Sequence, residues 1–228
     1  MIAVLSSLVI SLALALLCLA IPRRFQRVST WQVAVVFAAG LALWILGAAF
    51  SLGWYPWTNV ADFVVAVGAG MLLGRAIPAR FWPFFIFLLV MSSLDVAQIL
   101  LSATHATHSA AQSTNLPADE LYANFFLRLP WGKYSIGPFD LLMLAAIGAY
   151  WSRQGGRLFV AFVGMAIGFI AAYGILYADR GLTLPLIPFL MLGWLCSIGI
   201  ARSRSDRSPA AGSGARSGTI SKIRQEGQ

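Results

Sequence analysis

The chain has little charge for its length, because only 11% of its 228 residues are charged whereas 59% are hydrophobic. A soluble domain usually carries about 25% charged residues. This sequence therefore lacks the polar surface that would cover a globule in water. We expect lipid to be its main solvent, which excludes an ordinary soluble enzyme.

Cysteine, histidine and common catalytic motifs are also scarce. The two cysteines, Cys18 and Cys196, lie within apolar runs without ligand-like spacing, so we expect core residues rather than a disulfide or a metal site. His105 and His108 have no matching acidic motif. The sequence contains no HExxH, no GxSxG and no glycine-rich phosphate loop, so metallo-, serine- and nucleotide-dependent chemistries lack support. We therefore expect no metal and no cofactor.

Long apolar runs are what the sequence has in abundance. A helix needs about 20 residues to cross a membrane, and seven runs approach or exceed that length: roughly 2–20, 31–53, 60–77, 81–102, 135–151, 158–177 and 182–200. They predict an all-α polytopic bundle over residues 1–201 with about seven transmembrane helices. Residues 202–228 are rich in Ser, Gly and Arg without apolar periodicity, and we expect a disordered basic cytoplasmic tail.

The positive charges are unevenly distributed among the loops. The net charge of +8 comes from short clusters after apolar runs, which favours topology control and contact with anionic lipid over binding of nucleic acid. Clusters follow the first, third, fifth and seventh runs, whereas the alternate loops carry only Arg128, Lys133 and Arg180. This pattern predicts a multi-pass protein of the cell inner (plasma) membrane, with its N-terminus outside and its C-terminus in the cytoplasm.

Two acids interrupt neighbouring apolar runs at similar depth. Asp95 lies roughly 10 Å and Asp140 roughly 8 Å inside the exoplasmic boundary, counting 1.5 Å per helical residue. An ionised acid at such depth costs about 2.5–3.5 kcal/mol on insertion scales, so each should face the bundle interior or a wet cavity. Two carboxyls that meet there cannot both ionise easily, and the pair can act as base and acid toward water and a peptide bond.

Each acid also has an alternative interpretation. The run from Gly137 to Asp140 has the pattern of a helix start, with glycine at the cap, proline first and an acid third. Asp95 is equally consistent with a packing or proton-pathway acid that bonds Ser92 or Gln98. A third acid, Asp62, is expected to lie at an interfacial helix start.

These residues resemble the motifs of the presenilin and signal peptide peptidase family of intramembrane aspartyl proteases. Leu94-Asp95 resembles the first catalytic motif, although an aromatic residue usually precedes that acid. The run from Gly137 to Asp140 resembles the second, Gly-x-Gly-Asp motif, with Phe139 in place of its second glycine. Leu184-Pro185 falls where the family has Pro-Ala-Leu. The resemblance covers roughly residues 81–200, and the seven runs correspond to the last seven of the family's nine helices.

The resemblance implies an intramembrane aspartic endopeptidase with the orientation of signal peptide peptidase. Its catalytic residues would be Asp95 and Asp140, and its substrate a transmembrane or signal-peptide segment. Gly137, Phe139, Leu184 and Pro185 would contact that substrate. The alternative is a non-enzymatic polytopic protein, either a small proton-coupled carrier or a scaffold of a membrane complex. A carrier usually has two similar halves, and the chain shows no convincing internal repeat.

Overall fold

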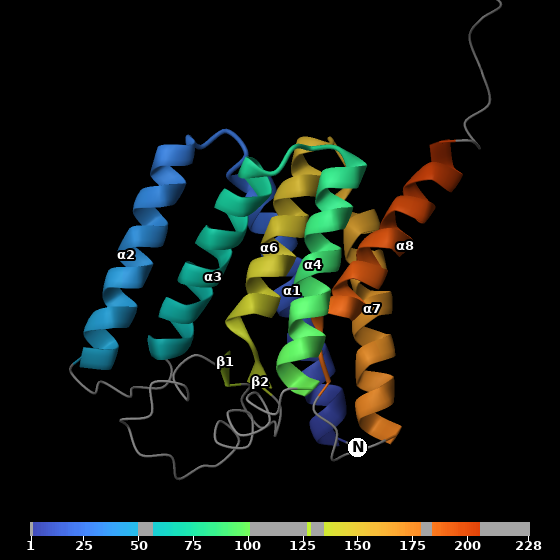
Figure 1. The fold of residues 1–228 in the computed structure, drawn as a ribbon, viewed down its shortest axis with the longest axis horizontal. Coiled ribbons are helices and arrows are strands. Elements are labelled where there is room, and N and C mark those ends of the chain that lie inside the picture. The colour runs from blue at the N-terminus through green and yellow to red at the C-terminus, as the bar shows by residue number, and fades with distance from the viewer. Residues whose placement is uncertain (1, 50–56, 101–126, 129–134, 179–183, 206–228) are drawn as a thin grey trace, which may run out of the picture.

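The computed structural model describes residues 2–49, 57–100, 127–128, 135–178 and 184–205. Within these residues the chain forms seven helices and one pair of two-residue strands (Figure 1). In order along the chain, the elements are α1 (Ile2–Arg24), α2 (Thr30–Ala49), α3 (Trp57–Ala76), α4 (Phe81–Leu100), β1 (Leu127–Arg128), β2 (Ser135–Ile136), α6 (Pro138–Arg153), α7 (Leu158–Ala178) and α8 (Ile187–Ser205). The predicted helical bundle is thus confirmed.

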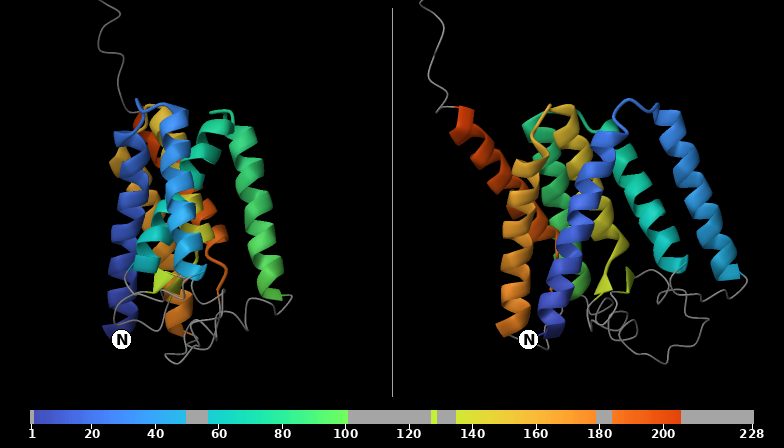
Figure 2. Two further views of the ribbon diagram at one scale, coloured as in Figure 1. Left: turned by 90° about the vertical axis from the view of Figure 1, so that its left-hand side faces the viewer. Right: turned by 180° about the vertical axis from the view of Figure 1, so that it is seen from behind.

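The helices lie side by side around α6 (Figures 1 and 2). Helix α6 packs against α3, α1, α8 and α7, whereas α2 packs mainly against α3 at the edge of the bundle. Short connections join α1 to α2, α3 to α4 and α6 to α7 at the same end (top of Figure 1). Helices α1, α3, α6 and α8 therefore run in one direction, and α2, α4 and α7 in the other.

Small residues bring α6 close to its neighbours. A Cβ atom on Gly74 of α3 would lie 2.6 Å from the Cβ of Ala149, and one on Gly70 would collide with the carbonyl oxygen of Leu142. In lipid, where burial supplies no hydrophobic drive between helices, such close backbone approach is a main source of association. The α6 side chains from Met143 to Ser152 are accordingly all buried.

The same device joins α7 to α8. A Cβ atom on Gly164 would lie 2.6 Å from the Cβ of Ser197, and one on Gly168 would collide with the carbonyl oxygen of Phe189. The glycines of α3 and α7 thus lie at the closest contacts with α6 and α8.

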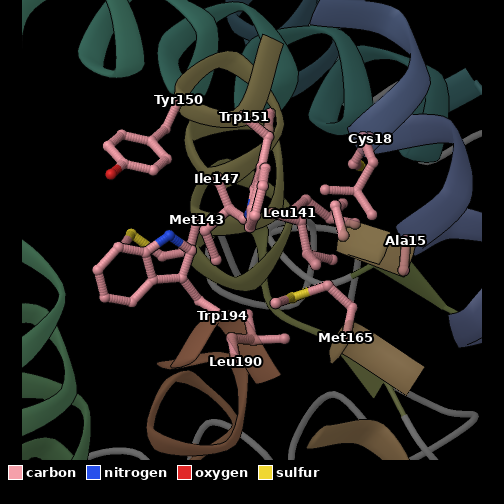
Figure 3. Close-up of a cluster of buried hydrophobic side chains, with 14 of the residues drawn as sticks. Ala15, Cys18, Leu141, Met143, Ile147, Tyr150, Trp151, Met165, Leu190 and Trp194 are labelled. Carbon is pink, nitrogen blue, oxygen red and sulfur yellow. The ribbon is translucent and has the colours of Figure 1, made fainter. Parts of the chain in front are cut away.

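An aromatic cluster holds α4 against α8 and α6. Phe84 of α4 stacks on Tyr150 of α6 with ring centroids 4.3 Å apart, and Phe81 stacks on Trp194 of α8 at 5.3 Å. Figure 3 shows Tyr150 and Trp194 beside the aliphatic core around Leu141, Ile147 and Met165. Cys18 is part of this core, as predicted, and both cysteines are free.

Three helices are long and apolar enough to cross a membrane, judged by length and composition: Leu5–Arg24 in α1, Thr30–Gly47 in α2 and Leu158–Ala178 in α7. Helices α4 and α8 contain the shorter apolar stretches Phe81–Ala97 and Ile187–Ser203. Helix α6 has 16 residues and so spans about 24 Å, less than the roughly 30 Å of a hydrocarbon core. Membrane-spanning character is therefore evident for three of the seven predicted runs.

Three predicted boundaries, in the fifth and seventh runs, differ from the structure. The fifth run was expected to start helix near residue 135, but α6 starts at Pro138, because residues 135–136 pair with β1 as a strand. The seventh was expected over 182–200, but α8 begins at Ile187, after Pro185, which lacks the N–H group that a helix interior needs. Helix α8 also continues to Ser205, so the first residues assigned to the tail are helical; residues 206–228 lie outside the described residues.

Arginines stabilise the end of the bundle where these connections lie. Arg153 donates from Nη1 to the carbonyl oxygens of Gly74, Arg75 and Ile77, which lie where α3 ends. Arg75 in turn donates to the carbonyl oxygens of Phe25 and Val28. The last carbonyls of a helix lack intrahelical donors, so these side chains act as caps. We call this the arginine end of the bundle, defined by Arg75 and Arg153.

Candidate active site

Asp140 lies in the first turn of α6, at the opposite end of the bundle from the arginine end. Gly137 precedes the helix in an extended conformation (φ −69°, ψ 150°), and Pro138 is its first residue. The backbone N–H of Gly137 donates to Oδ2 of Asp140 at 3.0 Å. The structure thus supports the helix-start interpretation, and Asp140 lies closer to the start of its helix than the sequence predicted.

Asp95 lies in the last third of α4 and contacts the start of α8. The backbone N–H of Ile187 donates to its Oδ2 at 3.0 Å, and the backbone of Leu186 also hydrogen-bonds the carboxylate. The first N–H groups of a helix have no intrahelical acceptor, so Asp95 supplies one from a neighbouring helix. Ser92, a predicted partner of Asp95, instead donates to the sulfur of Met191 at 3.9 Å.

The two carboxyl groups are close enough for their charges to interact. Both are partly buried, and each contacts backbone N–H groups at the start of a helix. Within the part of the chain that the structure describes, no basic side chain is among the groups that contact them. The charge of Asp95 therefore acts on Asp140 with no neutralising basic group among the described residues.

The predicted substrate-contact residues flank the two acids. Gly137 and Phe139 lie on either side of Pro138, and the Phe139 side chain is 54% exposed despite being apolar. Leu184 and Pro185 form a partly buried, non-helical segment directly before the two residues that bond Asp95. Strand β2 leads into Gly137 and pairs antiparallel with β1, with Leu127 opposite Ile136. One strand and one non-helical segment thus lead to the two acids.

Asp62 lies near the start of α3, as expected, but its interfacial position in the membrane stays a prediction. Its side chain is only 3% exposed, so it is buried within the bundle. It bonds the side chain of Trp44 on α2, and its Oδ2 has no hydrogen-bond partner among the described residues. The spacing carried a signal for this burial, because Asp62 precedes Ala66, Gly70 and Gly74 at four-residue intervals on a small-residue stripe.

The described residues contain no group of three or more His, Cys, Asp or Glu side chains suited to a metal ion, and His105 and His108 lie outside them. Comparison of the chain with protein-family models, with curated proteins and with solved structures found no match.

Proposed function

We propose that this chain is an intramembrane aspartic endopeptidase resembling the presenilin and signal peptide peptidase family. The observation that carries the proposal is that Asp95 of α4 and Asp140 of α6 lie within range of each other's charge, each carboxylate accepting a backbone N–H at the start of a helix. A carboxyl pair shielded from bulk water is the arrangement that acid–base cleavage of a peptide bond requires.

In the proposed reaction, the pair holds one proton and a water molecule. The ionised carboxylate takes a proton from the water molecule. At the same time the water oxygen attacks the substrate carbonyl carbon. The protonated carboxyl then gives its proton to the leaving nitrogen as the carbon–nitrogen bond breaks. We assign the water to the Oδ1 atoms, because both Oδ2 atoms accept backbone N–H bonds.

The substrate would be a transmembrane or signal-peptide segment that unwinds locally at the acids. An unwound backbone in lipid must find new hydrogen-bond partners. Strand β2 and the non-helical segment from Leu184 to Leu186 lie beside the two acids, so we propose that they pair with the substrate backbone as an added strand would. The exposed ring of Phe139 would contact an apolar substrate side chain.

The proposal includes a seven-span topology in the inner (plasma) membrane. The helices alternate in direction, and the arginine end collects Arg75 and Arg153 together with Arg23. By the positive-inside rule this end is cytoplasmic, so Asp95 and Asp140 lie toward the exoplasmic side. The N-terminus of α1 would then be outside and the C-terminal end of α8 in the cytoplasm.

A second candidate function is favoured by the hydrogen bonds themselves. Each Oδ2 atom accepts a backbone N–H at a helix start, which is what a purely structural acid does. The alternative is therefore a non-enzymatic polytopic protein, a scaffold or a small proton-coupled carrier, in which Asp95 and Asp140 fix the starts of α8 and α6.

Asparagine separates the two candidates, because it keeps the Oδ1 acceptor that a cap needs and removes the titratable acid. We expect Asp95→Asn and Asp140→Asn each to lower cleavage of a reporter transmembrane segment by about 10²-fold or more, while the protein remains folded. Asp62→Asn is the matched control, a buried acid outside the pair, and should retain activity. Full cleavage activity in either Asp95→Asn or Asp140→Asn would contradict the protease. The acids would then have only the structural role of fixing the two helix starts.

A further inference from the structure

A second group of polar side chains is buried between α1 and α7, apart from the acids. The hydroxyl of Ser11 donates to the carbonyl oxygen of Ser7 at 2.8 Å and hydrogen-bonds the hydroxyl of Tyr173 at 2.7 Å. Ser7 and Ser11 are 0% exposed, and Tyr173 is 7% exposed. Three hydroxyls gathered at one level of an apolar helix pair form a polar island within the bundle.

One member of this island lacks a partner. The hydroxyl oxygen of Ser7 is fully buried and has no hydrogen-bond partner among the described residues. Leaving a buried hydroxyl unpaired costs about 1–3 kcal/mol. Ser7 and Ser11 are one turn apart on the same face of α1, so the unpaired oxygen lies beside the bonded pair. Buried polar groups of this kind are commonly satisfied by an internal water molecule, which needs two to four polar partners.

The register of the helices places the island at the depth of the acids. Gly148 of α6 packs on α1, where a Cβ atom would lie 2.7 Å from the carbonyl oxygen of Cys18. The two helices run in the same direction, so Ser11, seven residues before Cys18, is level with Leu141, seven residues before Gly148. Leu141 follows Asp140, and packed helices lie about 8–10 Å apart. The hydroxyls therefore lie at about the same level along the bundle as Asp140.

We propose that Ser7, Ser11 and Tyr173 bind an internal water molecule. This internal water site lies at the level of the acids along the bundle, between apolar stretches of α1 and α7. Water binding follows from the hydroxyls alone; a role in supplying the water consumed at Asp95 and Asp140 rests on the proposed function. The sequence analysis did not identify this water site. A signal was present, because Ser7 and Ser11 lie on the same buried face of α1 as Ala15 and Cys18.

Hydroxyl-radical footprinting of the full-length protein in detergent tests the water site. Radicals are generated from water, so a buried side chain is oxidised quickly only where water is bound beside it. We expect Tyr173 to be oxidised several-fold faster than Phe169, which lies one turn away on α7 and is 0% exposed. In Ser7→Ala the rate at Tyr173 should fall several-fold, and Ser7→Thr, which keeps a hydroxyl, should restore it. Equal slow rates at Tyr173 and Phe169 in the wild-type protein would overturn the proposal.

Cleavage of the reporter segment tests the supply role separately. Ser7→Ala should lower kcat several-fold with KM unchanged, because water rather than substrate binding is affected. Asp95→Asn should abolish cleavage while Tyr173 is still oxidised quickly. If Tyr173 is oxidised quickly in a wild-type protein that cleaves no substrate, the water site is supported and the protease is refuted. If the protein cleaves substrate but Tyr173 is oxidised slowly, only the water site is refuted. If Ser7→Ala does not fold, Ser11→Ala provides the same comparison.

Discussion

Asp95 and Asp140 have an environment that a lipid-facing acid would lack. Each carboxylate lies at the start of a helix, where free N–H groups and the helix dipole favour negative charge. The two charges oppose each other, so the same local geometry that stabilises one ionised acid disfavours two. The proposed reaction needs one acid of the pair to hold a proton while the other is ionised.

The capping bonds predict how the stability of the Asp95 variants should rank. Asp95→Ala removes the acceptor for Ile187, and loss of a cap usually costs about 0.5–2 kcal/mol. Asp95→Asn keeps an acceptor and should lose much less. Thermal unfolding in detergent measures both variants against the wild-type protein. An alanine variant as stable as the asparagine variant would show that the bond to α8 contributes nothing.

Asp62 differs from the pair in its partners. It bonds the Trp44 side chain on the neighbouring α2, and no backbone N–H at a helix start is among its partners in the described residues. Its position joins the peripheral α2 to α3 and leaves it outside the proposed chemistry. This contrast makes it the appropriate control for the asparagine experiment.

At the scale of elements, α6 is the helix on which the site depends. It carries Asp140 at one end and Arg153 at the other, and four helices pack around it. Close contacts at Gly70 and Gly74 set its position against α3, and contacts at Gly164 and Gly168 set α7 against α8. Helix α8 in turn presents Ile187 to Asp95, so helix packing determines the geometry of the acids.

Two glycines of α7 provide a matched test of that packing. A side chain at Gly168 would collide with the backbone of Phe189, whereas nothing lies within 4 Å of a Cβ atom on Gly174. We expect Gly168→Leu to destabilise the protein by about 1–3 kcal/mol through overpacking and to separate α7 from α8. Gly174→Leu should leave the unfolding temperature nearly unchanged. Equal effects of the two substitutions would mean that α7 and α8 do not pack as described.

At the scale of the whole molecule, charge and chemistry are segregated to opposite ends. Arginines cap and link the connections between helices at one end, and the carboxyl pair occupies the other. The residues that the positive-inside rule reads as topology signals therefore also hold the tertiary structure together.

The capping role of Arg153 is testable against a nearby arginine. Arg153→Gln removes the donor shared by three carbonyls at the end of α3, and we expect a loss of about 1–2 kcal/mol, since these bonds are partly exposed. Arg157→Gln removes a positive charge from the same connection, where the side chain is exposed, and serves as the control. Unfolding temperatures that fall equally in both variants would point to a loss of charge rather than of the cap.

The sequence alone determined the class of the protein and most of its helices. Apolar run length decides where a helix can lie in lipid, and six of the seven helix starts differ by three residues or fewer from the predicted ones. Glycine, proline and acid at 137–140 also determined the helix start at Asp140, because capping is a local effect. The seventh start could not be read in this way, since the strength of a single proline as a boundary depends on its neighbours.

Only the tertiary structure decided which polar groups meet. Residues 95 and 187 are far apart in the chain, and their contact exists because α4 packs on α8. The burial of Asp62 and the bond between Ser11 and Tyr173 depend likewise on which helices are neighbours and how each is rotated. Apolar run length carries no information about rotation about the helix axis, whereas packing of small residues against a neighbouring backbone selects one rotation and thereby brings these side chains together.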